Sequence, residues 1–414
     1  MNQTPQALFR EREQRVLDAI ALHRPDRVPV IPLFGAFASA YAGISRKDEL
    51  YDQEKSYDAN LKVTLDFQPD MATAPLAFGP TMESLDYRQL KWSGYGLPDN
   101  LGYQFVEGEY MKPEEYDAFL FDPSDFTVRT YWPRILGQTA AFGKLPPLRT
   151  MISYFAGLSS GFMAFGTPEG IATLEALRRA GESSIQSFGA LQNYVRNVTA
   201  AGFPMFFASG TEAPFDALGD FFRGTKGVVL DMYRRPEKVM AACEKLLPIM
   251  LESAIPAAKA SGNPRVFIPL HKGSDNFMSL DQYQRFYWPT LRELLLALVK
   301  EGLTPVVLVE GPYNSRLETI RDIPEGKIVY WFEHVDIAKA KAIVGQRACI
   351  MGDVPMSLLS TGTVDQVKEY CKRLIDTAGE NGGFIMSSAA NLDDAKVGNA
   401  KAMIEFTREY GVYF

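Results

Sequence analysis

The chain carries five short apolar runs between residues 265 and 390, and each run ends in polar side chains. The runs are residues 266–270, 305–309, 328–332, 348–351 and 383–386, followed in turn by His271-Lys272, Glu310, Glu333-His334, Asp353 and Ser387-Ser388. Stretches of helical character separate them. Unbroken apolar runs of this length are typical of strands buried on both faces of a parallel sheet, so the pattern predicts consecutive βα units.

Three earlier segments complete the pattern. Residues 28–33, 71–76 and 203–207 are also apolar and raise the number of expected strands to eight. An amphipathic helix is expected over residues 5–22, before the first strand. Eight βα units predict a (β/α)8 barrel, and one elaborated barrel accounts for all 414 residues as a single domain, 1–414.

A long insertion is predicted between the second and third strands, over residues 77–200, because a single crossover needs far fewer residues. Its first part, through residues 94–107, is rich in turn residues and alternates apolar with polar positions, which indicates short strands. Thr167 followed by Pro168 then predicts the start of a helix that runs to residue 200. Such an insertion is placed to cover the barrel mouth.

Composition narrows the class of partner. The net charge is -7, and no Lys/Arg cluster is present that would follow a nucleic-acid backbone. The three cysteines, Cys243, Cys349 and Cys371, are widely spaced and predict neither disulfides nor a thiolate zinc site, which favours a cytoplasmic enzyme. No secretion signal, membrane span or glycine-rich phosphate loop is recognisable, so neither a membrane nor a nucleotide cofactor is expected.

His271 and Glu310 are the main catalytic candidates. Polar residues at the carboxyl ends of barrel strands converge on the active face. Imidazole titrates near neutral pH, and a carboxylate at the mouth is costly to bury unless it is paired, protonated or bound to a cation. The alternatives are a histidine hydrogen-bonded beneath a loop and a salt bridge from Glu310 to Lys272 or Arg316.

A divalent metal ion is a further expectation at this position. His271 and Glu310 would supply two ligands for a zinc-like ion, with His334 or Asp353 as a third. The alternative is a hydrogen-bond network without metal. Asp353 is also a catalytic candidate, unless it only caps its turn, and His334 is a substrate-binding candidate, unless it only introduces the next helix.

The remaining substrate-binding candidates lie in two loops. Tyr313, Asn314 and Arg316 offer a phenol, an amide and a fixed cation, a set suited to an oxygenated or anionic substrate. Phe34 and Phe37 follow the first expected strand and would form an apolar wall. For both groups the competing interpretation is that they anchor loops or pack in the core.

Several segments resemble the uroporphyrinogen decarboxylase superfamily. The resemblance rests on residues 15–20, 25–30, 279–289, 352–355 with 361–363, and 399–403. It implies a (β/α)8 barrel and one of two activities. One is cofactor-free decarboxylation of a porphyrinogen, and the other is zinc-assisted methyl transfer between a corrinoid protein and a thiol.

The chain departs from both patterns. The decarboxylases carry an arginine-rich loop after the first strand, whereas residues 33–41 contain no cation. The methyltransferases carry His-x-Cys and a later Cys, whereas the matching positions here are residues 308–310, which end in Glu310, and Ala389. The resemblance therefore implies a divergent member with altered chemistry.

The resulting hypothesis is corrinoid-linked methyl transfer on a small organic substrate, with the corrinoid carried by a partner protein. His271 and Glu310 would activate or position the methyl donor or acceptor, and Lys272, Asn314 and Arg316 would orient it. The alternatives are a decarboxylase of a small carboxylated substrate and a non-catalytic protein that binds a corrinoid or another ligand. The sequence leaves the oligomeric state open.

Overall fold

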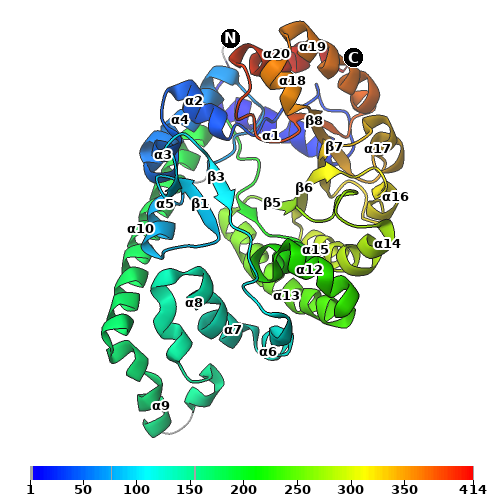
Figure 1. The fold of residues 1–414 in the computed structure, drawn as a ribbon. Coiled ribbons are helices and arrows are strands. Elements are labelled where there is room, and N and C mark those ends of the chain that lie inside the picture. Colours follow the sequence, from blue (N-terminus) through cyan, green and yellow to red (C-terminus); the bar gives the residue numbers. More distant parts are fainter. Residues whose placement is uncertain (1–2, 76, 153–154, 414) are drawn as a thin grey trace.

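A computed structural model describes residues 3–75, 77–152 and 155–413 and has a parallel sheet at its centre (Figure 1). Within the described residues the sheet has six strands in the order β4-β5-β6-β7-β8-β9, and every neighbouring pair is parallel. Their bounds are Ser209–Gly210, Arg265–Leu270, Thr304–Pro312, Val329–His334, Cys349–Val354 and Phe384–Ser388. The last five match the apolar runs of the sequence, so the predicted βα pattern is confirmed there.

The three earlier segments are less regular than predicted. Residues 28–33 pair with β9 through one bridge, between Val30 and Met386. Residues 71–75 pair with residues 203–207 through another, between Ala72 and Met205; residue 76 lies outside the described residues. Prolines at positions 29, 32, 75 and 204 remove backbone donors from these segments, which is why they do not form full ladders.

Helices follow the strands along the second half of the chain and surround the sheet (Figure 1). They begin at predicted positions, since the side chains of Ser279, Asp336 and Thr363 each accept a hydrogen bond from the first helical turn. Their bounds are α11 (Pro214–Ala217), α12 (Gly224–Arg234), α13 (Pro236–Ser261), α14 (Leu280–Gln282), α15 (Trp288–Lys300), α16 (Leu317–Ile320), α17 (Ile337–Ile343), α18 (Met356–Thr361), α19 (Val364–Leu374) and α20 (Val397–Tyr410).

Two of the three buried apolar clusters of the described residues lie on opposite faces of the sheet. Along β6, Val306 and Leu308 belong to one buried cluster, while Val307 and Val309 belong to the other. Side chains that alternate along a strand point to opposite faces. Both faces of the sheet are therefore covered, which explains why the strands are continuously apolar.

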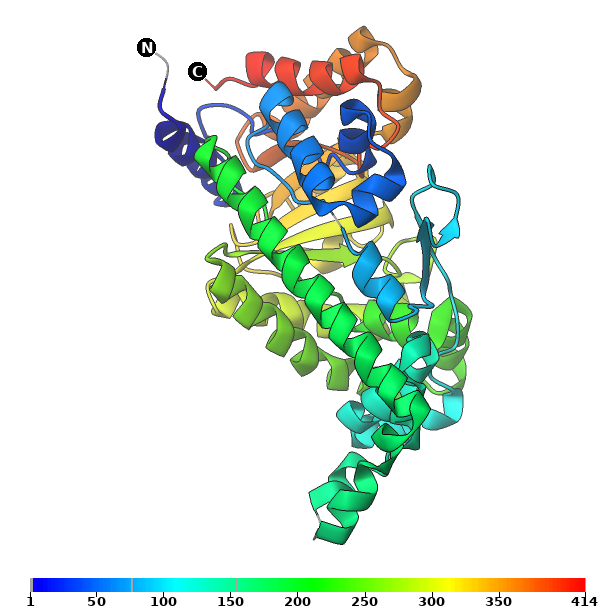
Figure 2. The same cartoon turned by 90° about the vertical axis from the view of Figure 1, so that its left-hand side faces the viewer.

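Residues 79–200 form the part of the chain that extends beyond the sheet (Figures 1 and 2). Its first part contains, after one short helix, a small sheet of β1 (Leu90–Ser93), β2 (Gly96–Leu97) and β3 (Tyr103–Phe105), in agreement with the short strands predicted there. The 33-residue helix α10 (Pro168–Ala200) ends the region, and Thr167 caps it as predicted. The other helices here are α5 (Gly79–Ser84), α6 (Tyr116–Phe121), α7 (Pro123–Phe126), α8 (Trp132–Ile135) and α9 (Phe155–Gly161).

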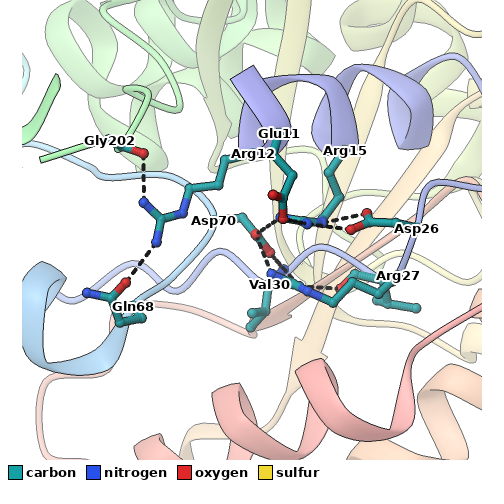
Figure 3. Close-up of polar contacts among 10 residues, drawn as sticks. Glu11, Arg12, Arg15, Asp26, Arg27, Val30, Gln68, Asp70 and Gly202 are labelled. Carbon is teal, nitrogen blue, oxygen red and sulfur yellow. Dashed lines mark hydrogen bonds and ion pairs between the residues drawn. The ribbon is translucent and has the colours of Figure 1, made fainter. Parts of the chain in front are cut away.

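A buried ionic cluster joins the first elements of the chain (Figure 3). Asp70 is fully buried and receives hydrogen bonds from Arg15 at 2.7 Å, from Arg27 at 2.7 and 2.9 Å, and from the backbone N–H of Val30 at 2.7 Å. Arg15 comes from α1 (Pro5–Ile20), which agrees with the expected first helix, and it also binds Asp26. This cluster fixes α1 and residues 26–30 against the segment after α4 (Gln53–Phe67).

Two short helices, α2 (Ala36–Ala42) and α3 (Arg46–Tyr51), follow residues 28–33, the segment that pairs with β9. No helix in the described part of the chain combines a bilayer-spanning length with sufficient apolar character.

Candidate functional site

The carboxyl ends of β5 and β6 bring the two main candidates together. Leu270, which ends β5, pairs with Val309 of β6, so His271, which follows β5, and Glu310, which lies inside β6 near its end, stand at the same edge of the sheet. The Nε2 atom of His271 lies 3.9 Å from Oε1 of Glu310. The side chains are 34% and 44% exposed, so each is open to small molecules on one side. The predicted proximity of these two residues is confirmed.

Asp220 holds the other side of the imidazole. Its Oδ2 atom lies 2.6 Å from Nδ1 of His271, and its Oδ1 atom lies 2.5 Å from Nζ of Lys272. Burial would raise the pKa of Asp220, but its contacts with His271 and Lys272 hold that pKa below the ordinary value. A carboxylate on Nδ1 fixes the ring orientation and leaves Nε2 directed toward Glu310.

The charge state of His271 follows from these contacts. Burial alone would lower the pKa of His271, but the hydrogen bond to Asp220 and the charges of Asp216 and Glu310 raise it to about 9. Partial burial raises the pKa of Glu310, and the positive charge of His271 opposes that rise. At neutral pH the site therefore presents an imidazolium.

Asp216 supports the site from beneath. Its carboxylate accepts hydrogen bonds from the backbone N–H of His271 at 3.0 Å and of Lys272 at 2.9 Å. The hydroxyl of Tyr287 donates a third hydrogen bond. Burial raises the pKa of Asp216 to about 6. These bonds fix the backbone at the end of β5, so Asp216 positions His271 without reaching the mouth.

Glu212 is a fourth acidic group that interacts electrostatically with the imidazole, after Glu310, Asp220 and Asp216. Burial raises its pKa to about 7, the charge of His271 opposes the rise, and Asp220 and Asp216 add to it. Its Oε2 atom is buried and, among the described residues, has no hydrogen-bond partner. A buried carboxyl with an unused oxygen and a pKa near neutrality is suited to proton transfer.

The sequence reasoning missed Glu212, Asp216 and Asp220. The signal for Glu212 was present, because it follows the segment 203–210 as Glu310 follows its apolar run. Asp216 and Asp220 come four and eight residues later, from α11 and the π-helical segment Leu218–Arg223. Residues at this spacing lie on one face of a helix.

His334 and Asp353 lie in a neighbouring cavity of about 320 Å³, which Gly311, Glu333 and Tyr370 also line. Asp353 is inside β8 and not beyond it, and the Tyr370 hydroxyl donates to its Oδ1 at 3.1 Å. Burial raises the pKa of Asp353 to about 6. His334 is exposed at the end of β7. The lining of this cavity includes neither His271 nor Glu310.

The loop after β6 is placed differently from the expectation that it binds substrate. Tyr313 is fully buried, and its ring meets that of Tyr283 edge-on at 5.8 Å. Arg316 is 1% exposed and donates to the carbonyl oxygens of Gly273 and Ser274, each at 3.3 Å. Both side chains anchor this loop to the one after β5, so we remove them from the candidate site.

Asn314 accepts a hydrogen bond from the backbone N–H of Asp336 at 2.8 Å, which ties the same loop to the one after β7. Phe34 and Phe37 are each 2% exposed and pack against Phe67, with ring centroids 5.7 and 5.4 Å apart. They belong to the core and form no wall at the mouth. For these residues the packing alternative holds.

A cavity of about 450 Å³ has Phe267 of β5 in its wall and so lies near the His271 cluster, but neither His271 nor Glu310 is among the residues that line it. Phe207 and Phe267 line it with stacked rings 4.7 Å apart, and Tyr103 of β3 lines it from the side of the small sheet. Burial and then the charge of Glu310 raise the pKa of Tyr103, so Glu310 acts on this cavity electrostatically. The cavity is large enough for a small organic molecule.

The expected metal ion would need a third protein ligand beside His271 and Glu310. His271 and Glu310 supply two ligands, but nowhere in residues 3–75, 77–152 and 155–413 do three His, Cys, Asp or Glu side chains form a group that could hold a metal. The third ligand expected from His334 or Asp353 does not join the pair. The arrangement does not fit a three-ligand zinc site, and metal binding stays a prediction.

Known proteins resemble this chain in sequence and in fold. Residues 165–410 match the family described as Uroporphyrinogen decarboxylase (URO-D). The uroporphyrinogen decarboxylase of Chlorobium phaeobacteroides is 25% identical over 189 residues, which cover 44% of this chain and 52% of that protein. That of Chlorobium phaeovibrioides is 25% identical over 184 residues, 43% of this chain and 51% of that protein. The chain thus spans about half the length of the curated relatives it matches.

A methyltransferase from Methanosarcina mazei has the same fold. The two structures superpose with a TM-score of 0.65 at 15% sequence identity, and the alignment covers 99% of each chain. The likeness therefore includes the residues before 165, which the family match does not reach.

Proposed function

The chain belongs to the uroporphyrinogen decarboxylase family, and from that premise we propose that it transfers a methyl group from a small organic substrate to a corrinoid carried by a partner protein. The observation that carries the proposal is the His271 imidazolium, held by Asp220 on Nδ1 and open toward Glu310 on Nε2. Fold likeness to a methyltransferase over the whole chain agrees with it.

The proposed scaffold is a closed (β/α)8 barrel that forms one domain, 1–414, with residues 77–200 inserted between the second and third strand segments. Closure is supported by three contacts: the bridge from Val30 to Met386, the hydrogen bond from the backbone N–H of Asp70 to the carbonyl oxygen of Val30 at 2.9 Å, and the bridge from Ala72 to Met205. Together they connect β9 back to the segment preceding β4. In such a barrel the His271 cluster lies at the carboxyl-end mouth, where barrel enzymes place their chemistry.

The proposed step needs a proton at the leaving atom. When a methyl group departs from oxygen or nitrogen, the carbon–heteroatom bond breaks and its electron pair stays on the heteroatom. His271 Nε2 donates a proton to that atom, which prevents a strongly basic leaving group from forming. A reduced corrinoid, bound by the partner protein, would supply the nucleophile that accepts the methyl group.

The acidic neighbours of His271 have separate roles in this proposal. Asp220 holds the ring and keeps it protonated, and Glu310, 3.9 Å from Nε2, accepts a hydrogen bond from the same substrate group that His271 protonates. Glu212, with a pKa of about 7, returns a proton to the imidazole after each turnover. Lys272 is paired with Asp220 and acts through it, so its role is to position that carboxylate.

Charge argues against a porphyrinogen substrate. The two cations of the cluster, His271 and Lys272, already face Asp220, and Glu212 and Glu310 add further acidic groups. A substrate with many carboxylates requires several free Arg or Lys partners. A neutral methylated compound suits this cavity better, because its leaving atom needs the proton of His271, and the aromatic lining would contact the methyl-bearing group.

Turnover assays would separate the proposed activities. We would incubate the protein with methoxylated phenols or methylated amines and reduced cobalamin, follow methylcobalamin absorbance, and test carboxylated compounds for CO₂ release in parallel. Methylcobalamin formation supports the proposal, CO₂ release would instead indicate a decarboxylase, and ligand binding without turnover would indicate a binding protein. Elemental analysis of the same sample tests the expected zinc-like ion.

His271→Gln should reduce methyl transfer by roughly 10²- to 10⁴-fold, the usual contribution of a general acid. His23→Gln is the matched control, because His23 is exposed in a loop before the first sheet segment. Equal activity in both variants would refute the assignment of His271.

A further inference from the structure

The long helix α10 has two faces of different character. Thr173, Ala176, Ala180, Tyr194 and Val198 are buried against the rest of the molecule. The opposite face lies along the outside of the molecule (Figure 2). A surface helix of this kind is normally polar on its outer face.

The outer face of α10 is not uniformly polar. Seven exposed positions, spaced alternately by three and four residues, run along it; we call them the α10 stripe, and they are Ile171, Leu174, Arg178, Gly181, Ile185, Phe188 and Gln192. Four of these side chains are large and apolar, with exposures of 60% for Ile171, 47% for Leu174, 75% for Ile185 and 61% for Phe188. This spacing is that of a coiled-coil seam.

We propose that two copies of this chain associate through the α10 stripe, with the two helices antiparallel. A two-fold axis between residues 179 and 180 places Ile171 opposite Phe188 of the other copy and Leu174 opposite its Ile185. The same axis places Arg178 opposite Gly181, where the absence of a side chain leaves room for the arginine. Every large apolar residue of the stripe thus meets another, so the surface is complementary to itself.

Charge also favours a second copy. Arg178 pairs with Glu175 at 2.8 Å and with Glu182 on its own helix, and Arg179 lies 3.7 Å from Glu175. Two acidic and two basic groups therefore flank the centre of the stripe. Two copies would meet there without a net charge of either sign, whereas a nucleic acid or an anionic membrane would require an excess of cations.

The available area suits a modest dimer. A helix of 33 residues is about 50 Å long and about 10–12 Å wide, so its outer face offers roughly 500–600 Å² per copy. Specific interfaces start at about 600 Å² per partner. Phe162 and Met163, 55% and 71% exposed, lie just before the start of α10, and antiparallel association brings this end of the helix near the last turn of α10 in the other copy. There they would adjoin the cleft of about 610 Å³ between α4 and α10 and extend the contact.

Sedimentation velocity of the full chain over a range of concentrations tests the association. We expect a monomer–dimer equilibrium, and Ile185→Asp/Phe188→Asp should sediment as a monomer. Leu280→Asp/Val397→Asp is the matched control, because these residues are 37% and 42% exposed and each begins a helix, where an acidic residue is favourable. The control should dimerise as the unmodified chain does, and circular dichroism verifies that both variants fold.

Cysteine cross-linking tests the register. Leu174→Cys/Ile185→Cys should form a disulfide-linked dimer on mild oxidation, while each single variant should not. Positions 174 and 185 are about 16 Å apart along one helix, too far for a bond within a chain, and the natural cysteines are buried. A monomer at every concentration, a dimer that survives the double aspartate variant, or cross-linking of either single variant would overturn the proposal.

Discussion

His271 and Asp220 are joined by a 2.6 Å contact between Nδ1 and Oδ2, although they lie 51 residues apart in the chain. The contact leaves one imidazole nitrogen for chemistry and holds the ring as a cation. The protonation of His271 therefore depends on a residue that does not itself reach the substrate.

The pH dependence of turnover should show that Asp220 controls the protonation of His271. If protonated His271 is the acid, kcat/KM is constant at neutral pH and falls as pH rises through about 9, the pKa of His271. Asp220→Asn removes the charge that raises this pKa, so the alkaline limb should move to lower pH by roughly 1–3 units. The measurement is kcat/KM from pH 6 to 10 for both proteins.

His271→Gln serves as the control for that profile, since its residual activity should lack the limb near pH 9. An Asp220→Asn variant that loses activity equally at every pH would show a purely structural role for Asp220 and contradict the link.

Glu212→Gln should change how stability depends on pH. Burial raises the pKa of Glu212 from 4.5 to about 7, so the folded protein holds this proton more tightly than the unfolded chain does. Ionisation then costs stability as pH rises from about 4.5 to 7, and glutamine has no such cost. Between pH 5 and pH 8 the variant should gain roughly 1–3 kcal/mol relative to the unmodified protein, measured by urea unfolding. A difference that does not vary with pH would contradict this prediction.

Tyr313→Phe should leave KM and kcat nearly unchanged, because the Tyr313 side chain is fully buried and does not line the cavity beside Glu310. Tyr287→Phe makes a matched comparison within the same aromatic cluster. It removes a hydrogen bond to Asp216 and should lower kcat by loosening the backbone of His271. Steady-state kinetics distinguish the two, and a large rise in KM for Tyr313→Phe would return that residue to the substrate site.

Asp70→Asn should destabilise the fold by roughly 3–5 kcal/mol, since it removes the charge of the fully buried carboxylate that Arg15 and Arg27 share. Asp376→Asn removes a half-exposed ion pair with Lys372 and should cost at most about 0.5 kcal/mol. Denaturant unfolding gives both values. Similar losses in the two variants would show that the buried cluster contributes no more than a surface pair.

Apolar runs were sufficient to predict the second half of the fold. Runs such as 305–309 are buried on both faces, so their composition and length identify them as strands whatever the details of packing. Residues 28–33 also have strand composition, but their prolines limit pairing to the bridge at Val30. Local composition does not show which backbone groups find a partner.

The sequence predicted those site residues that stand at the carboxyl ends of neighbouring strands. It did not predict the residues whose position depends on how a helix packs against the sheet. His271 follows β5 and Glu310 lies near the carboxyl end of the adjacent β6, so their meeting follows from sheet geometry alone. Asp216 and Asp220 reach His271 only because the helical segment after β4 packs beside the end of β5, which no local pattern announces. Tyr313 has the side chain of a ligand-binding residue, yet its burial depends on Tyr283.

The Asp70 cluster has a consequence for how this protein can be altered. It draws together α1, residues 26–30 and the end of the α4 segment through charged hydrogen bonds, and none of its members contributes to the cavity beside Glu310. The side chains that hold the amino-terminal elements together are thus different from those proposed to carry out the reaction. Residues at the carboxyl ends of the strands can therefore be substituted to change the reaction without removing the contacts of the Asp70 cluster. This separation makes the chain a suitable scaffold for active-site design.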